Sequence, residues 1–374
     1  MQFLQSRCRS TFVLVWIFGV CVSCTPINRA DAIFEDYLYR MSNVFQFDEI
    51  ALPVVTIESF PSRRKLQYQP PQLSLNLLEF LRLSRCELQR LLGARNSSLG
   101  ITMANSQHWL YELSFIELAQ QCLQTLASSS KTEGLRQQLE LALMQKRSSL
   151  EEIYWNATWG SEEFQYVFSA GITPMTQQQL ELRPIVLEQA LIELLAGANY
   201  WQSLSDDERR TRFESQLAVL ASEKYLGQLR VSMNLARQYL LAIERAVTDM
   251  EDSSPLCGTA RLSRRTEIME RVFMRYYIGA VQPMLSGLHQ RIEQIREVFM
   301  AAPATEIVRA ADADDRSFAQ SGFVGTTQEH ALIDYWQAVW ADRAGSEWRL
   351  YQQAISSHTL MWQDVLRRCD RLPH

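Results

Sequence analysis

The stretch that decides the fold reads DDERRTRFESQLAVLASEKYLGQLRVSMNLARQYLLAIERAVTDM, from Asp206 to Met250. It contains no proline, its apolar residues recur at helical spacing, and it opens with three acids, which favour the positive end of a helix dipole. The sequence therefore predicts one long helix here, with a break near Gly227. A second long helix is predicted from Arg264 to Ala301, kinked at 279–283 because Pro283 cannot donate a backbone hydrogen bond.

Helical periodicity extends outward from this stretch in both directions. Glycine and proline number only 14 and 11 in 374 residues, and so few chain breakers favour helices. Residues 51–71 differ, because prolines and β-branched residues there predict an extended strap with room for one short strand. The predicted fold is mainly α, an irregular multi-helix bundle with one extended, proline-containing strap near the N-terminus. The other predicted helices are 30–45, 73–94, 105–126 (capped by Asn105 or Ser106), 131–154, a short one at 163–168, 185–202, 329–341 and 346–368.

The first residues carry an export pattern. Arg7 and Arg9 precede an apolar run over 11–23, which is shorter than the roughly 20 residues that a bilayer span needs. Residues 1–23 are therefore predicted to be a signal peptide. Ser23-Cys24 resembles the lipobox of bacterial lipoproteins, which implies lipidation of Cys24, a tether over 24–28 and, because Thr25 is not aspartate, the periplasmic face of the outer membrane rather than the inner membrane. A plain secretory signal is the alternative.

Charge limits the classes of partner. The net charge is −5 and becomes about −7 in the mature chain, because the signal segment carries two arginines and no acid. We expect no nucleic-acid partner, since such binding depends on Lys and Arg contacts to phosphate. No basic patch for anionic lipid is evident either, so the membrane would be reached through the lipid anchor. Residues 29–374 are predicted to form a single all-helical periplasmic domain, with a sub-division considered near 253–262.

Four cysteines remain in the mature chain besides Cys24, namely Cys86, Cys122, Cys257 and Cys369. An even number in an oxidising compartment favours disulfides over buried thiols, and four cysteines allow three pairings. We predict Cys86–Cys122, on successive helices folded into a hairpin by the 96–100 turn, and Cys257–Cys369, in a turn and near the chain end. The first pair leaves an axial mismatch of about 12 Å for the loop to absorb.

The sequence offers no recognisable constellation for catalysis or metal binding. Its five histidines are scattered, and neither H-E-x-x-H, G-x-S-x-G nor a phosphate-binding glycine loop occurs. The four remaining cysteines, Cys86, Cys122, Cys257 and Cys369, form neither a C-x-x-C pair nor a Cys/His cluster for zinc. We therefore assign no catalytic residue, metal or cofactor. The tryptophans at helical spacing, Trp336, Trp340, Trp348 and Trp362, are predicted to be core residues rather than a ligand box.

Several stretches resemble a known family. They are DYLYR at 36–40, FPSRR at 60–64, LRLSRCELQRLLGARNSSLG at 81–100 and WLYEL at 109–113. Together they are similar to the uncharacterised proteobacterial lipoproteins grouped as domain of unknown function 3080. The resemblance implies a bacterial envelope location and brings no assigned activity, cofactor or catalytic residue.

The turn at 95–100 allows two interpretations. Turn residues alone can close a helix there, with glycine and asparagine at its end and serine side chains on open carbonyls. In the other interpretation, Arg95, Asn96, Ser97 and Ser98 contact a ligand or partner. For the whole chain we expect a non-enzymatic binding or accessory protein, whose partner is an unknown envelope protein or ligand. The alternative is a hydrolase acting on envelope substrates, with a site assembled from dispersed acids.

Overall fold

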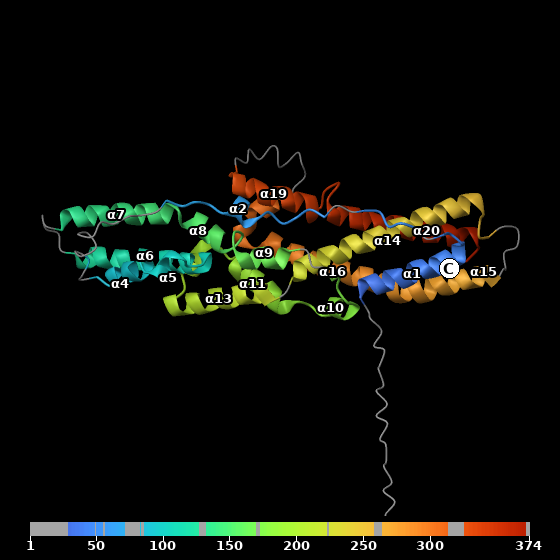
Figure 1. Cartoon of the computed structure of the whole chain (residues 1–374), viewed down its shortest axis with the longest axis horizontal. Coiled ribbons are helices and arrows are strands. Elements are labelled where there is room, and N and C mark those ends of the chain that lie inside the picture. The colour runs from blue at the N-terminus through green and yellow to red at the C-terminus, as the bar shows by residue number, and fades with distance from the viewer. Residues whose placement is uncertain are drawn as a thin grey trace, which may run out of the picture.

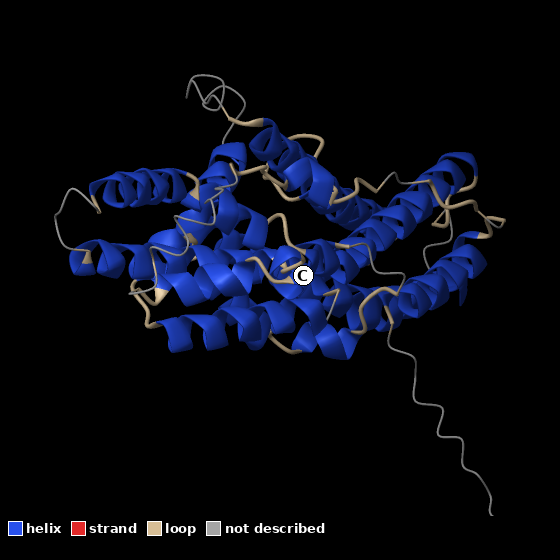
Figure 2. Ribbon diagram, turned by 60° about the vertical axis from the view of Figure 1, so that its left-hand side comes forward, coloured by secondary structure: helices blue, strands red, loops and turns tan. Residues whose placement is uncertain are grey.

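The computed structural model describes residues 29–48, 50–54, 57–71, 83, 86–126, 132–169, 173–222, 224–257, 264–312 and 325–371. These ranges form helices and contain no strand (Figure 2), so the predicted mainly α, multi-helix fold is confirmed. None of their helices combines the length and apolar composition that a bilayer crossing requires. Residues 1–28 lie outside the described residues, so the signal peptide, the lipidation of Cys24 and the tether stay predictions.

The stretch at 206–250 forms two helices, α13 (Asp206–Ser222) and α14 (Tyr225–Ser253). The break lies at Lys224, whose backbone is not helical, and Gly227 is buried within α14. The two halves bury their apolar residues against different neighbours. The first half packs on α9 (Glu162–Phe168) and α11 (Ile185–Leu194), and α14 packs on α1 (Ala30–Phe45) and α20 (Glu347–Arg368). Packing, rather than glycine, therefore decides where this helix breaks.

The predicted kink at 279–283 takes the form of a π-helix. Helix α15 (Arg264–Val272) continues into η1 (Phe273–Val281), a π-helix, and then into α16 (Gln282–Ala301). The backbone N–H of Gln282 bonds to the carbonyl of Tyr277, five residues back. Pro283 is the second residue of α16, directly after the π-helix, so its missing N–H lies where the backbone hydrogen-bond pattern changes from i→i−5 to i→i−4.

The helices at one end of the elongated molecule form a layered hairpin (Figure 1). Helix α4 (Leu88–Arg95) and α5 (Ser98–Ile101) follow one another along α6 (Asn105–Thr125), which α7 (Glu133–Ser148) also contacts. Ser149 separates α7 from α8 (Leu150–Ala157), so the predicted helix 131–154 is two helices. Of the predicted helix 73–94, residues 73–82, 84 and 85 lie outside the described residues. Neither Asn105 nor Ser106 caps α6, since the cap position is Ala104.

Both predicted cysteine pairs are present as disulfides, with Cα atoms 5.3 Å apart in Cys86–Cys122 and 5.2 Å apart in Cys257–Cys369. The expected axial mismatch in the first pair arose from placing the turn too early. Helix α5 extends the first arm of the hairpin, and the chain reverses only at 102–104 before α6 begins. Cys86 and Cys122 are then about equally far from the turn.

The predicted strap runs extended along the outside of the bundle, interrupted by a single helical turn, α2 (Arg63–Leu66) (Figure 1). The short strand considered for it does not occur in its described residues. Its anchor is Phe60, which stacks on Phe168 at 4.5 Å and meets Tyr335 edge-on at 5.0 Å between ring centroids. The backbone N–H of Glu58 donates to the Glu347 carboxylate, which also pairs with the buried Arg230.

Aromatic side chains fill much of the core. Trp336, Trp340, Trp348 and Trp362 are each at most 1% exposed, so the core assignment of these tryptophans is confirmed. The remaining helices close the chain around that core. They are α10 (Gln177–Glu181), α12 (Ala198–Gln202), the 3-10 turn η2 (Pro303–Thr305), α17 (Glu306–Asp312) and α19 (Thr327–Val339).

Candidate functional site

A cleft of about 710 Å³ opens where five segments distant in sequence meet. They are the strap, α8 with the turn after it, the α11–α12 turn, the 303–307 segment and the start of α19. The lining combines aromatic rings, carboxylates and exposed backbone. Its residues are Tyr68, Glu151, Glu152, Tyr154, Trp155, Thr158, Trp159, 196–199, Pro303, Ala304, Glu306, Ile307, Thr326 and Glu329.

Asn156 fixes Tyr68 at the edge of the cleft. The side-chain oxygen of Asn156 accepts a hydrogen bond from the Tyr68 backbone N–H at 2.7 Å, and its amide nitrogen donates to the Tyr68 carbonyl at 3.0 Å. The amide thus takes the place of a neighbouring strand. The Tyr68 ring meets Trp155 edge-on at 6.0 Å between centroids, and its hydroxyl lies 2.6 Å from Thr326 Oγ1. The strap is therefore tied to α8 and α19 on two sides of the opening.

The opposite wall is a backbone turn made possible by glycine. Gly197 has φ +93°, a conformation that L side chains rarely adopt, and it ends the predicted helix 185–202 early by separating α11 from α12. The buried Tyr154 hydroxyl accepts a hydrogen bond from the Gly197 N–H at 3.1 Å and donates to the Leu194 carbonyl. The N–H of Ala304 donates to the Leu195 carbonyl at 3.0 Å. These hydrogen bonds fix the backbone of residues 194–197, which forms this wall.

Carboxylates dominate the electrostatics of the cleft. Glu151, Glu152, Glu306 and Glu329 line it, and the described lining residues include no lysine, arginine or histidine. Partial burial raises the pKa of Glu151. The carboxylate of Glu329 accepts from the Thr326 N–H at 2.7 Å and thereby caps α19, which leaves the other three carboxylates as the acids best placed for a ligand.

This arrangement suits recognition of a positively charged group. Carboxylates attract a cation, and the faces of Trp155 and Tyr68 can add cation–π contacts. Among the described lining residues, the Thr158 hydroxyl donates to the Tyr154 carbonyl. The Thr326 hydroxyl donates to the Glu329 carboxylate within the cap of α19. The described residues also contain no group of three or more His, Cys, Asp or Glu side chains that could hold a metal ion.

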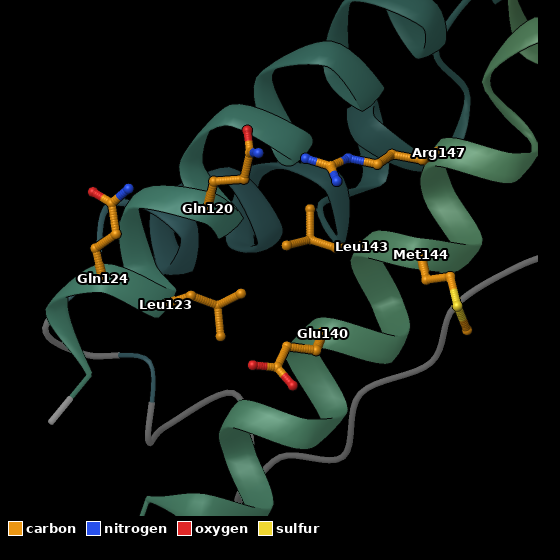
Figure 3. Close-up of a pocket in the computed structure, with 7 residues that line it drawn as sticks. All are labelled: Gln120, Leu123, Gln124, Glu140, Leu143, Met144 and Arg147. Atoms are coloured by element: carbon orange, nitrogen blue, oxygen red, sulfur yellow. The ribbon is translucent and has the colours of Figure 1, made fainter. Parts of the chain in front are cut away.

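A second depression, of about 490 Å³, lies between α6 and α7. Figure 3 shows Leu123 and Leu143 pointing toward one another across it, with polar side chains around them. Deeper between the same helices, the buried carboxylate of Glu112 bonds Lys146 at 2.5 Å and His108 at 3.0 Å. This ion pair fixes α7 to α6, so the depression is a shallow groove over a firmly joined helix pair.

The turn at 95–98 uses its polar groups locally. Ser97 Oγ accepts from the Gly100 N–H at 3.2 Å and donates to the Ala94 carbonyl at 2.7 Å. Arg95 donates to the Gly100 carbonyl and lies over the Tyr111 ring. A Cβ at Gly100 would overlap the Arg95 carbonyl, so glycine is required there. Neither Asn96 nor Ser98 lines a described depression. The helix-closing interpretation explains these contacts, and contact with a ligand or partner stays a prediction.

The residues of the cleft were not predicted from the sequence. Tyr68 belongs to the strap and Asn156 lies just after the predicted helix 131–154, and they meet across 88 residues. The available signal was the irregular stretch from Asn156 to Gly160, which interrupts a helical region where the backbone needs partners from elsewhere.

Comparison with known proteins places most of the chain in one family. The model of the family described as "Protein of unknown function (DUF3080)" matches residues 34–373. Searches of curated proteins and of solved structures returned no match.

Proposed function

The chain belongs to the DUF3080 family, and we propose that this member is a lipid-anchored envelope protein that binds a cationic ligand without transforming it. Its place would be the periplasmic face of the outer membrane, reached through Cys24. The lipobox-like sequence supports the anchor, and two paired disulfides fit an oxidising compartment.

The observation that carries the binding role is the acidic, aromatic cleft with fixed walls, whose described lining residues include no cationic side chain. A preformed site loses little entropy on binding, because Asn156 and Tyr154 already hold its backbone. An amine or guanidinium group would lie between Glu152, Glu306 and the Trp155 ring. The ligand would be an envelope molecule or an envelope protein that presents such a group.

One observation favours a second candidate, a hydrolase acting on envelope substrates. A carboxyl group whose pKa is raised by partial burial can donate a proton to a leaving group, and Glu151 has this property beside other carboxylates. Glu151 would be the general acid, with Glu152 or Glu306 as the base.

Binding is tested on the mature Cys24→Ala protein with spermidine and arginine as probes, by calorimetry. The structure predicts saturable binding that is lost in a Glu152→Gln/Glu306→Gln variant. The matched control is Glu140→Gln, an acid of the α6–α7 groove, which should bind normally. Equal affinity in all three proteins would contradict the proposal.

The hydrolase is tested by incubating the protein with purified envelope glycans and peptides. Product release that disappears in Glu151→Gln, with unchanged thermal unfolding, would replace the binding role by catalysis. The anchor is tested separately, since Cys24→Ala should abolish palmitate labelling and release the protein from membranes. Unchanged labelling in that variant would refute lipidation at Cys24.

A further inference from the structure

Four large apolar side chains on one face of the molecule are exposed to solvent. Leu182, Ile185 and Val186 are 66%, 65% and 68% exposed, and Ile192 is 45% exposed. Leu182 directly follows α10, and Ile185 and Val186 are the first two residues of α11. Ile192 lies two helical turns after Ile185, on the same side of α11. Exposed apolar side chains grouped on neighbouring helical turns are the kind of surface that contacts a partner or a membrane. We call these four residues the α10–α11 patch.

The patch is held rigidly by the helices beneath it. Leu180 is buried, and its carbonyl accepts a hydrogen bond from the Arg291 side chain at 2.9 Å. A Cβ at Gly287 would lie 3.0 Å from the Leu180 Cβ, so α10 approaches α16 as closely as a glycine allows. Pro184 then separates α10 from α11. The exposed side chains thus belong to a fixed surface rather than to a loose loop.

The patch lies next to the point where the N-terminal segment joins the fold. The N–H of Ala30 donates to the Met175 carbonyl at 3.0 Å, and Arg29 forms a bridge with Thr176, the residue that caps α10. Figure 1 shows α1 beginning beside α10. Because α10 has five residues, it carries the chain only about 8 Å from this point to Leu182.

The tether limits how far a lipid on Cys24 can be from the patch. Four residues separate Cys24 from Arg29, and the five Cα-to-Cα steps between the two span at most about 17 Å when extended. The patch can therefore reach the bilayer that holds the lipid. Tethering also turns contact with the bilayer into an intramolecular event, so a patch too small to bind a membrane alone can still dock on one.

We propose that the α10–α11 patch docks on the lipid bilayer in which Cys24 is anchored and orients the domain on the membrane. This inference rests on the lipid anchor of the proposed function. Electrostatic adsorption would need a basic surface, but Arg183 within the patch pairs with Glu188 at 2.7 Å and the chain is acidic. Docking through apolar side chains should therefore depend little on salt concentration.

The test places a fluorescent probe on single cysteines. The full lipidated protein is reconstituted in vesicles of phosphatidylethanolamine with a minor share of phosphatidylglycerol. In Val186→Cys, the engineered thiol is the one left to label, because the four other mature cysteines are paired. The control is Leu141→Cys on α7, equally apolar, 60% exposed and far from α10 in Figure 1.

On vesicles, the emission of the probe at position 186 should shift to shorter wavelengths. Nitroxide-labelled lipids should also quench this emission, and both effects should occur at low and at high salt. The Leu141 probe should show neither change. If both probes stay in water although the protein carries palmitate and remains on the vesicles, docking is refuted and the anchor stands. If palmitate and vesicle binding are both missing, the anchor itself fails. The probe at position 186 could instead become shielded from water without lipid, to a degree that rises with protein concentration. That result would assign the patch to a contact with a second copy of the chain and overturn docking.

Discussion

Acidification should destabilise the folded protein through one buried imidazole, that of His358. The ring lies in the core between α1, α14, η1 and α20. Its Nε2 accepts a hydrogen bond from the Tyr37 hydroxyl at 2.8 Å, and its Nδ1–H donates to the Leu240 carbonyl at 3.2 Å. Tyr37 in turn accepts from Trp362 Nε1 at 2.7 Å, and the Tyr277 ring covers the imidazole at 5.3 Å. The neutral ring is fully satisfied, and none of these partners carries a charge that would stabilise the imidazolium.

The size of the effect follows from the pKa of His358. Burial lowers this pKa from 6.5 to about 4, although the hydrogen bond to Leu240 opposes the shift. The unfolded chain binds a proton below pH 6.5, whereas the folded chain stays neutral until about pH 4. Unfolding therefore becomes easier as the pH falls through this window. The difference of about 2.5 between the two pKa values corresponds to about 3 kcal/mol, absent above pH 6.5 and complete below about pH 4.

Urea unfolding of wild type and His358→Gln across this pH window measures the contribution. Other groups titrate in both proteins, so the difference between the two unfolding free energies isolates the imidazole. That difference should move by about 3 kcal/mol against the wild type as the pH falls from 6.5 to about 4. NMR titration of the histidine signal that disappears in the variant gives the pKa directly. A difference that stays constant with pH, or a measured pKa near 6.5, would refute the reasoning.

Three further predictions concern stability. Gly197→Ala should lower the unfolding free energy by about 1–3 kcal/mol because φ is +93° there. The control Gly134→Ala, in α7 with open space around it, should raise it by up to about 1 kcal/mol. Thermal unfolding measures both changes. Glu347→Ala should cost about 3–5 kcal/mol in urea unfolding, because it leaves a buried guanidinium unpaired, and a loss under 1 kcal/mol would show that water reaches this pair. Removing the Cys257–Cys369 bridge, which closes the longer loop, should cost about 1 kcal/mol more than removing the other bridge, and equal losses would contradict the loop-entropy account.

The helical elements were predictable from the sequence because periodicity and low glycine and proline content are local signals. The long helices at 206–250 and 264–301 were found this way, as were α1, α6 and α20. The break at Ser149 was not predicted, and the break at Lys224 was predicted slightly too late, near Gly227, since neither Ser149 nor Lys224 is a chain breaker. Helices α7 and α8 both pack on α6, so a change of partner does not explain the break at Ser149. At Lys224 the chain passes from packing on α11 to packing on α1 and α20, and such partners are set by the tertiary fold.

The cleft could not be predicted for the same reason. Tyr68 reaches it through the strap, and the amide of Asn156 that fixes Tyr68 comes from another part of the sequence. The acids Glu151 and Glu306 read as ordinary first-turn residues of α8 and α17, which they also are. Only the approach of those two helix starts to the Gly197 turn makes them part of one surface. Local patterns carry no information about that approach.

The residues that carry the family resemblance support the fold away from the cleft. Phe60 stacks in the core, Arg63 pairs with Glu162, and Gly100 permits a tight turn. None of these three lines the cleft. Yet the first two fix the strap, and the strap carries Tyr68 to the cleft. Phe60 and Arg63 therefore shape the cleft from a distance, and the side chains that line the cleft lie in stretches without a motif.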